Sequence, residues 1–90
     1  MADVLRGRVT RVIDGDTFEI GSVTATAPSG NKYSSTETIR IADIDAPELN
    51  TGAGKRSKDA LERKLNGKNV TCTVKSRDTY GRVVASVRVG

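Results

Sequence analysis

Five short apolar runs, with one helix-like segment between the third and the fourth, most constrain what this chain can fold into. The runs are rich in Val, Ile and Thr and are separated by Gly, Asp, Asn or Pro, which is the pattern of β-strands and turns. In the first run the apolar parity changes between Val9 and Val12, which predicts a β-bulge or a strand buried on both faces. We expect strands at Val4 to Ile13, Thr17 to Ile20 with Val23 to Thr26 as a candidate extension, Glu37 to Ile44, Asn69 to Ser76, and Val83 to Val89.

The segment between the third and fourth runs has the pattern of a short helix. Ser57 can cap its first turn, and Gly67 can end it in the left-handed conformation, so that Leu65 is close to its last residue. We expect Ala60, Leu61 and Leu65 to face the core. Three strands, a helix and two strands in so short a chain predict a mainly β fold with one helix, a small and partly open five-stranded barrel of the OB type.

The whole chain, residues 1–90, is expected to form a single domain, since it has only 90 residues. Its net charge is +4, but the charge is uneven: residues 1–48 hold 5 Lys and Arg against 8 Asp and Glu, and residues 49–90 hold 10 against 3. The chain therefore combines an acidic half with a basic half, as a metal-bridged phosphate site requires, although ordinary surface scatter explains the totals equally well. The N-terminus lacks the apolar run of a signal peptide and no stretch could span a membrane, so we expect an intracellular protein or a trimmed secreted one.

Acidic residues gather where two of the predicted strands end. Asp14 and Asp16 close the first strand, and Asp45 and Glu48 bracket the proline that stops the third. Carboxylate oxygens suit a hard cation, Ca²⁺ or Mg²⁺. Zinc is nearly excluded because the chain has one cysteine, Cys72, and no histidine. A turn aspartate that only bonds its own backbone is the simpler interpretation for Asp14 and Asp16, and it stays open.

Two arginines accompany these carboxylates. Arg40 lies within the third predicted strand, and Arg82 opens the fifth directly after an Asp-Thr-Tyr-Gly turn. Each could be a simple surface or ion-paired charge. Together, beside a carboxylate cluster, they could clamp a phosphodiester from the side opposite a metal ion and stabilise its extra charge in the transition state.

In order and spacing these residues resemble the staphylococcal nuclease-like (thermonuclease) family. The resemblance runs from about Gly7 to Val89 and implies an OB-type barrel with calcium-dependent hydrolysis of DNA and RNA phosphodiesters. Chains of this family normally continue past the fifth strand, so we expect a trimmed piece or a minimal relative that lacks the C-terminal segment. Three motifs carry the resemblance: Asp14-Gly15-Asp16-Thr17, Arg40 with Asp45-Ala46-Pro47-Glu48, and Asp78-Thr79-Tyr80-Gly81-Arg82.

The resemblance also implies the ligands of a metal ion. Asp16 and Asp45 would bind Ca²⁺ directly, or Mg²⁺ in its place, with the help of the backbone carbonyl of Ala46. Asp14 would lie close by.

The remaining matching residues would act on the substrate. Glu48 would orient or deprotonate the attacking water, Arg40 would hold the phosphate, and Arg82 would stabilise the charge of the pentacoordinate phosphorus or the leaving oxygen. Tyr80 would contact the phosphate edge of the substrate. The expected partners are DNA and RNA, with single strands preferred and no membrane, and the protein is expected to act as a monomer.

A second function class stays open, a non-catalytic OB-fold module that binds single-stranded nucleic acid. Such modules stack bases on aromatic side chains, and this chain has only Phe18, Tyr33 and Tyr80. A binding module also has no need of acidic residues that face a phosphate and repel it. The sequence therefore favours the nuclease over the binding module.

Overall fold

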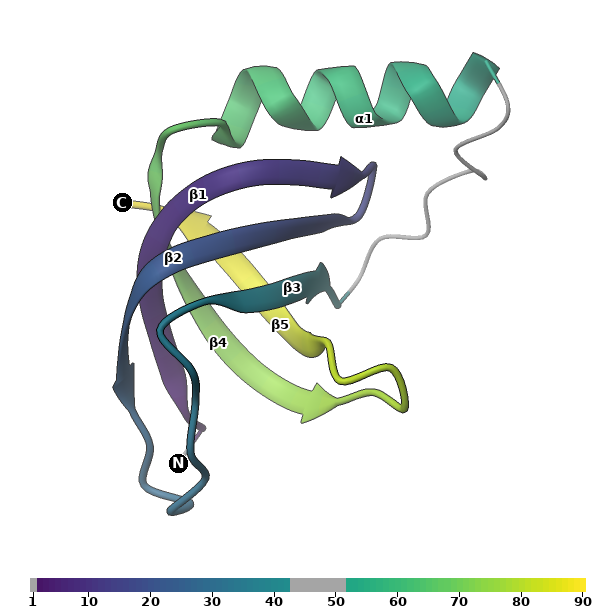
Figure 1. The fold of residues 1–90 in the computed structure, drawn as a ribbon. Coiled ribbons are helices and arrows are strands. Elements are labelled where there is room, and N and C mark those ends of the chain that lie inside the picture. The colour runs from purple at the N-terminus through teal and green to yellow at the C-terminus, as the bar shows by residue number, and fades with distance from the viewer. Residues whose placement is uncertain (1, 43–51) are drawn as a thin grey trace.

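The five strands close into a barrel, and one helix lies across one end of it (Figure 1). The structure is a computed structural model that describes residues 2–42 and 52–90. Its elements are β1 (Val4–Asp14), β2 (Thr17–Thr26), β3 (Glu37–Ile41), α1 (Gly52–Leu65), β4 (Asn69–Arg77) and β5 (Val83–Val89). The strand order around the barrel is β1-β2-β3-β5-β4. The mainly β, OB-type barrel expected from the sequence is confirmed, except that it is closed rather than partly open.

Pairing between β3 and β5 closes the barrel. All other neighbouring strands are antiparallel, but β3 and β5 run parallel, with Ile39 opposite Val83 and Arg40 opposite Val84. A parallel neighbour needs a long crossover connection, and in this chain helix α1 and β4 lie between the two strands. The third and fifth strands are thereby placed side by side.

The predicted bulge in the first strand is confirmed. The β1–β2 register shifts between Val9 and Arg11, with two further shifts in the same pair of strands. Both Val9 and Val12 are buried, and β1 pairs with β2 on one side and β4 on the other. A bulge bends a strand and increases its twist, so β1 can curve around the barrel, as Figure 1 shows.

Apolar side chains from all five strands fill the barrel. The fully buried ones include Leu5, Phe18, Ile20, Ile39 and Val83. Along β5, Val83 and Ala85 are buried, whereas Val89 at the end of the strand is 53% exposed.

The helix begins earlier than expected, and two of the three residues expected to face the core, Leu61 and Leu65, do so. It starts at Gly52 rather than near Ser57, and Ala60, expected in the core, is exposed. Leu65 and Gly54 are buried and Leu61 packs against the core, which is the stripe that a spacing of three or four residues produces. Packing of this stripe outweighs the weak helix propensity of the glycines in the first turn.

The C-terminal end of the helix follows the prediction. Gly67 has a positive φ of 73°, and its N–H donates to the Val9 carbonyl at 3.2 Å.

Within the described ranges, no helix is both long enough and apolar enough to cross a bilayer.

The third strand is shorter than expected. It ends at Ile41 rather than Ile44, and the N–H of Ala42 donates to the Ala85 carbonyl of β5 at 2.9 Å. Residues 43 and 44 lie outside the part of the chain that the structure describes.

Candidate functional site

The β1–β2 turn places two carboxylates at one end of the barrel. Asp14 pairs with Thr17 in the hairpin, and Asp16 lies in the turn between them. The Asp14 Oδ1 accepts the Gly15 N–H at 2.7 Å, so its side chain does bond its own backbone, as the simpler interpretation held. Asp16 is different, because it is only 8% exposed and is fixed by two other elements.

Asp16 is held between β2 and β3. Its Oδ1 accepts the hydroxyl of Thr17 at 2.9 Å, and its backbone carbonyl accepts the N–H of Ile41 at 2.8 Å. Its Oδ2 lies 3.6 Å from Nη2 of Arg40. The structure therefore brings the expected metal ligand Asp16 and the expected phosphate ligand Arg40 into one ion pair.

Arg40 lies in the strand that joins the two halves of the site. It is opposite Thr17 on β2 and opposite Val84 on β5. Because Ile39 and Val83 are fully buried side by side, their neighbours Arg40 and Arg82 project toward the other side of the sheet. The two arginines thus start from the same outer face of two adjacent strands.

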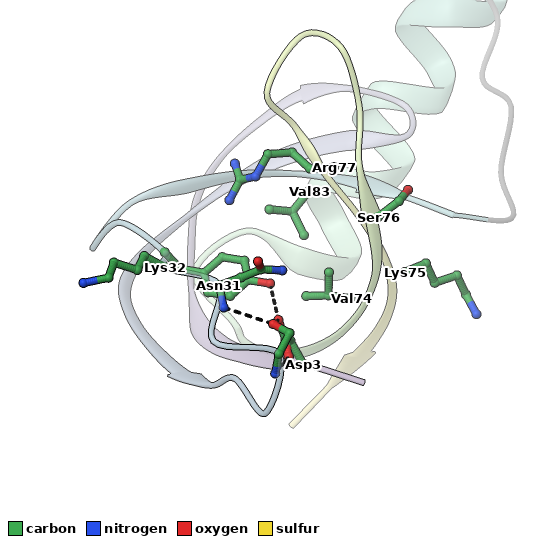
Figure 2. Close-up of a pocket in the computed structure, with 10 residues that line it drawn as sticks. Asp3, Asn31, Lys32, Val74, Lys75, Ser76, Arg77 and Val83 are labelled. Carbon is green, nitrogen blue, oxygen red and sulfur yellow. Dashed lines mark hydrogen bonds between the residues drawn. The ribbon is translucent and has the colours of Figure 1, made fainter. Parts of the chain in front are cut away.

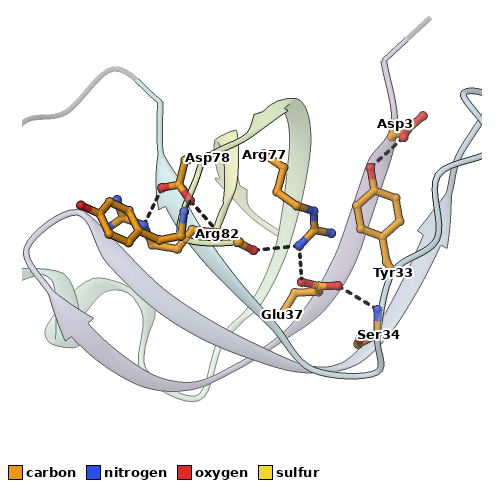
Figure 3. A network of polar contacts seen from close by, with 9 residues as sticks. Asp3, Tyr33, Ser34, Glu37, Arg77, Asp78 and Arg82 are labelled. Carbon is orange, nitrogen blue, oxygen red and sulfur yellow. Dashed lines mark hydrogen bonds and ion pairs between the residues drawn. The ribbon is translucent and has the colours of Figure 1, made fainter.

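The β4–β5 turn holds Arg82 through an aspartate (Figure 3). Oδ2 of Asp78 accepts Nε–H of Arg82 at 2.6 Å, and Oδ1 accepts the backbone N–H of Arg82 at 2.8 Å and that of Tyr80 at 3.0 Å. Desolvation acts to raise the pKa of Asp78, but the hydrogen bonds and charge of Arg82 outweigh it, and the pKa lies below its ordinary value. The Arg82 guanidinium carbon is 5.3 Å from the ring centre of Tyr80, which is 83% exposed.

The remaining expected site residues belong to the part of the chain that the structure does not describe. Asp45, Ala46 and Glu48 lie outside the described residues. Within residues 2–42 and 52–90, no three acidic, cysteine or histidine side chains gather in a way that could hold a metal ion. The expected roles of these residues therefore stay predictions.

A polar network that the sequence did not reveal connects this turn to the start of β3 and the β2–β3 connection (Figure 3). Nη1 of Arg77 donates to Oε1 of Glu37 at 3.2 Å and to the Gly81 carbonyl at 2.8 Å. Its guanidinium lies 5.6 Å from the ring centre of Tyr33. Glu37 and Arg77 are 40 residues apart, so no local pattern indicates their contact.

The network ends at a buried carboxylate near the N-terminus. Asp3 is 5% exposed and accepts the Tyr33 hydroxyl at 2.7 Å and the Ser29 hydroxyl at 2.5 Å. The hydrogen bond from Ser29 and then that from Tyr33 hold the pKa of Asp3 below its ordinary value. Burial and the bond to Asp3 raise the pKa of Tyr33. No signal in the sequence indicated Asp3, which is preceded only by Met1 and Ala2.

Comparison with known proteins gives a consistent family. The family model described as "Staphylococcal nuclease homologue" matches residues 38–90. An uncharacterized endonuclease of Escherichia coli is 37% identical over 83 residues, which are 92% of this chain and 48% of that protein. Protein ParB of Escherichia coli is 35% identical over 94% of this chain and 42% of its own length. Micrococcal nuclease of Shigella flexneri is 35% identical over 91% of this chain and 41% of its own length. The chain thus spans about half the length of these relatives, or slightly less.

Proposed function

Since the chain belongs to the staphylococcal nuclease family, we propose that it hydrolyses phosphodiester bonds of DNA or RNA with the help of a divalent cation. Two relatives, an uncharacterized endonuclease and a micrococcal nuclease, support this reaction class. The relatives are about twice as long, so the activity of this chain is the point to test.

One observation carries the proposal: β3 lies between β2 and β5. This places Arg40 opposite Thr17, the neighbour of Asp16, and opposite Val84, two residues after Arg82. A carboxylate and two guanidinium groups therefore start from adjacent strands at one end of the barrel. Guanidinium groups bind phosphate oxygens through paired hydrogen bonds, and a carboxylate offers oxygens to a cation.

The proposed cation is Ca²⁺, with Mg²⁺ as the alternative. Asp16 would hold it, with Asp14 close by, and we propose Asp45 and the Ala46 carbonyl as further ligands. An oxygen donor set fits a hard cation, and the single thiol, Cys72, is buried in the core away from solvent. A bound cation of this kind polarises a phosphoryl oxygen and neutralises charge that develops on it.

The protein side chains would supply the remaining chemistry. Because the chain has no histidine, either a carboxylate or a metal-bound hydroxide would serve as the base, and we assign to Glu48 the role of orienting or deprotonating the attacking water. Arg40 would bind the phosphate oxygens beside Asp16, and Arg82 would donate to the oxygen on which charge develops. Asp78 would keep Arg82 in place, since it accepts the Nε–H of Arg82 at 2.6 Å.

We propose single-stranded DNA and RNA as the preferred substrates and a monomer as the active form. The exposed ring of Tyr80 beside Arg82 supports the preference, because an unpaired base can stack on it, whereas the bases of a duplex are already stacked on one another. Cleavage of matched single-stranded and double-stranded oligonucleotides compares the two substrates directly. Equal rates on both would contradict the preference.

The deciding experiment is cleavage of denatured DNA at mildly alkaline pH with CaCl₂, with MgCl₂ and with EDTA. We expect degradation that needs the cation, and a loss of roughly 10²- to 10³-fold in kcat for Arg82→Ala, the usual effect of removing one donor to a developing charge. Glu48→Gln should abolish cleavage but leave nucleic-acid binding nearly intact. A pure binding module would show binding but no cleavage, with or without this substitution. Arg88→Ala, near the C-terminal end of β5, serves as the matched control for Arg82→Ala. Cleavage in EDTA, or cleavage that survives both site variants, would overturn the proposal.

A further inference from the structure

We propose that a cavity next to the β4–β5 turn binds backbone phosphates of the same single strand, at a second position beside the candidate cleavage site (Figure 2). The inference rests on the proposed function in one respect only, that the ligand is the substrate strand. The cavity has a volume of about 440 Å³. Its walls come from the N-terminal segment, the β2–β3 connection, the end of β4 and the first residue of β5.

Positive charge dominates the cavity. Lys32, Lys75 and Arg77 line it, against one carboxylate, Asp3. Figure 2 shows the two lysines on opposite flanks of the cavity, and both are exposed. In the part of the chain that is described, neither lysine makes an ion pair. A polyanion that entered the cavity would therefore meet a free cation from each side.

The nearby carboxylates are engaged within the protein. Asp3 keeps its negative charge, but it is 5% exposed and accepts three hydrogen bonds, two from Ser29 and one from Tyr33. Both oxygens of Glu37 are also engaged, Oε1 with Arg77 and Oε2 with the Ser34 N–H at 2.8 Å. Among the described residues the two lysines have no acidic partner, so their charge outweighs that of the single buried carboxylate in the cavity.

Arg77 gives the cavity a fixed hydrogen-bond donor. Its Nη1 is held by Glu37 and by the Gly81 carbonyl, and its guanidinium lies over the Tyr33 ring at 5.6 Å. Among the described residues, Nε and Nη2 of Arg77 make no hydrogen bond. A guanidinium that is already oriented loses little entropy when it binds, so these N–H groups are suited to phosphate oxygens.

The position of the cavity identifies the phosphates as those of one strand. Arg77 donates to Gly81, the residue directly before Arg82, so the cavity and the candidate phosphodiester site lie on either side of one turn. Figure 3 shows Arg82, Arg77 and Tyr33 in a row along this side of the molecule. A strand bound at Arg82 therefore reaches the cavity as it passes the turn. A cationic groove that follows the backbone is the usual way in which single strands are held.

The test is binding of fluorescein-labelled oligothymidylates in EDTA, which separates binding from any cleavage that needs a cation. One ligand is a dinucleotide, and the other has about twelve residues, within the roughly 4–16 nucleotides that an OB fold occupies. The variant Lys32→Ala/Lys75→Ala is compared with Lys64→Ala/Lys68→Ala. The control lysines are also exposed. Lys64 lies in the last turn of α1 and Lys68 in the loop that follows it, and their replacement changes the net charge equally.

We expect the Lys32/Lys75 variant to bind the longer oligonucleotide with lower affinity. The slope of log K against log salt should fall in magnitude by about 1.4, or about 0.7 for each phosphate that is no longer neutralised. The control should change both much less, and neither variant should affect the dinucleotide. Equal effects of the two variants on the long ligand would overturn the inference. The inference would also be overturned if the Lys32/Lys75 variant lost affinity for the dinucleotide by the same factor as for the longer oligonucleotide. The same holds if the variant lowered the affinity of inorganic phosphate, measured by competition with the labelled ligand, by the same factor. In either case the cavity would be a site for a small anion.

Cleavage with CaCl₂, measured in parallel, distinguishes this inference from the proposed function. A protein that cleaves but shows equal slopes for both variants refutes the second phosphate site alone. A protein that does not cleave but loses affinity only in the Lys32/Lys75 variant refutes the proposed nuclease activity alone.

Discussion

At the scale of single residues, Asp78 organises the β4–β5 turn. It accepts two backbone N–H groups and the Nε–H of Arg82, and its pKa lies below the ordinary value. An aspartate with a depressed pKa stabilises the fold at pH values above the unfolded-state pKa, about 3.9, and this contribution is lost as pH falls toward the folded-state pKa.

We therefore expect Asp78→Asn to be less stable than the wild type at neutral pH and to approach it below the folded-state pKa. The acid limb of its stability curve should be shallower. Urea unfolding followed by circular dichroism between neutral and strongly acidic pH measures this. Asp59→Asn, on the exposed side of α1, is the control, and a parallel offset of Asp78→Asn at every pH would contradict the titration.

Cys72 is a second residue whose environment determines its chemistry. It is fully buried, and burial raises the pKa of its thiol to about 12. Since the thiolate is the reactive form, we expect no measurable reaction with a disulfide reagent such as DTNB at pH 8 in the folded protein and a rapid reaction in urea. Reaction of the folded protein at the rate of a free thiol would show that strands β1 and β4, which pair at this residue, open readily.

At the scale of elements, β1 depends on a glycine at its bend. A Cβ at Gly7 would lie 2.9 Å from the Gly21 carbonyl oxygen and 3.1 Å from Cβ of Ile20. Backbone atoms of a neighbouring strand cannot move aside cheaply, so the close approach of β1 and β2 requires glycine at this position.

Gly7→Ala should therefore destabilise the protein, by about 1–3 kcal/mol in the range of overpacked sites. Gly52→Ala, whose Cβ would meet only the flexible end of Arg56 at 3.4 Å, should be neutral or stabilising. Thermal unfolding of the two variants tests this comparison. If both lose the same stability, the contact with Gly21 is not the cause.

The helix and the third strand show where sequence patterns reach their limit. The alternation of apolar residues in strands and the cap residues of helices are local signals. They therefore predicted all five strands and the end of α1 before Gly67. The earlier start at Gly52 depends on burial of Gly54, and this packing cannot be read from propensity. The sequence assigned Asp16 and Arg40 to one candidate site but did not predict their ion pair, and the Glu37–Arg77 contact joins residues that only the closed barrel brings together.

At the scale of the whole molecule, a small core must stabilise the entire barrel. A 90-residue chain has a stability of roughly 5–13 kcal/mol at 0.05–0.15 kcal/mol per residue. Phe18 is the largest of the fully buried side chains. Its loss therefore removes a large fraction of the total.

We expect Phe18→Ala to cost about 3–5 kcal/mol and Ile39→Val about 0.5–1.5 kcal/mol. Urea unfolding should show one cooperative transition for the wild type and for Ile39→Val. Phe18→Ala should be partly unfolded without denaturant or nearly so. A full native baseline for Phe18→Ala with an unchanged midpoint would mean that the core tolerates the cavity.

The parallel pairing of β3 with β5 also determines when the candidate site can exist. Arg40 and Val84 are 84 − 40 = 44 residues apart, and contacts between residues so distant in the chain form slowly. A protein is synthesised from its N-terminus, so the β1–β2 hairpin with Asp14 and Asp16 can form early. The pairing of β3 with β5 at Arg40 can form only after β5 has been synthesised. During synthesis, the candidate site therefore stays incomplete until β5 has emerged from the ribosome.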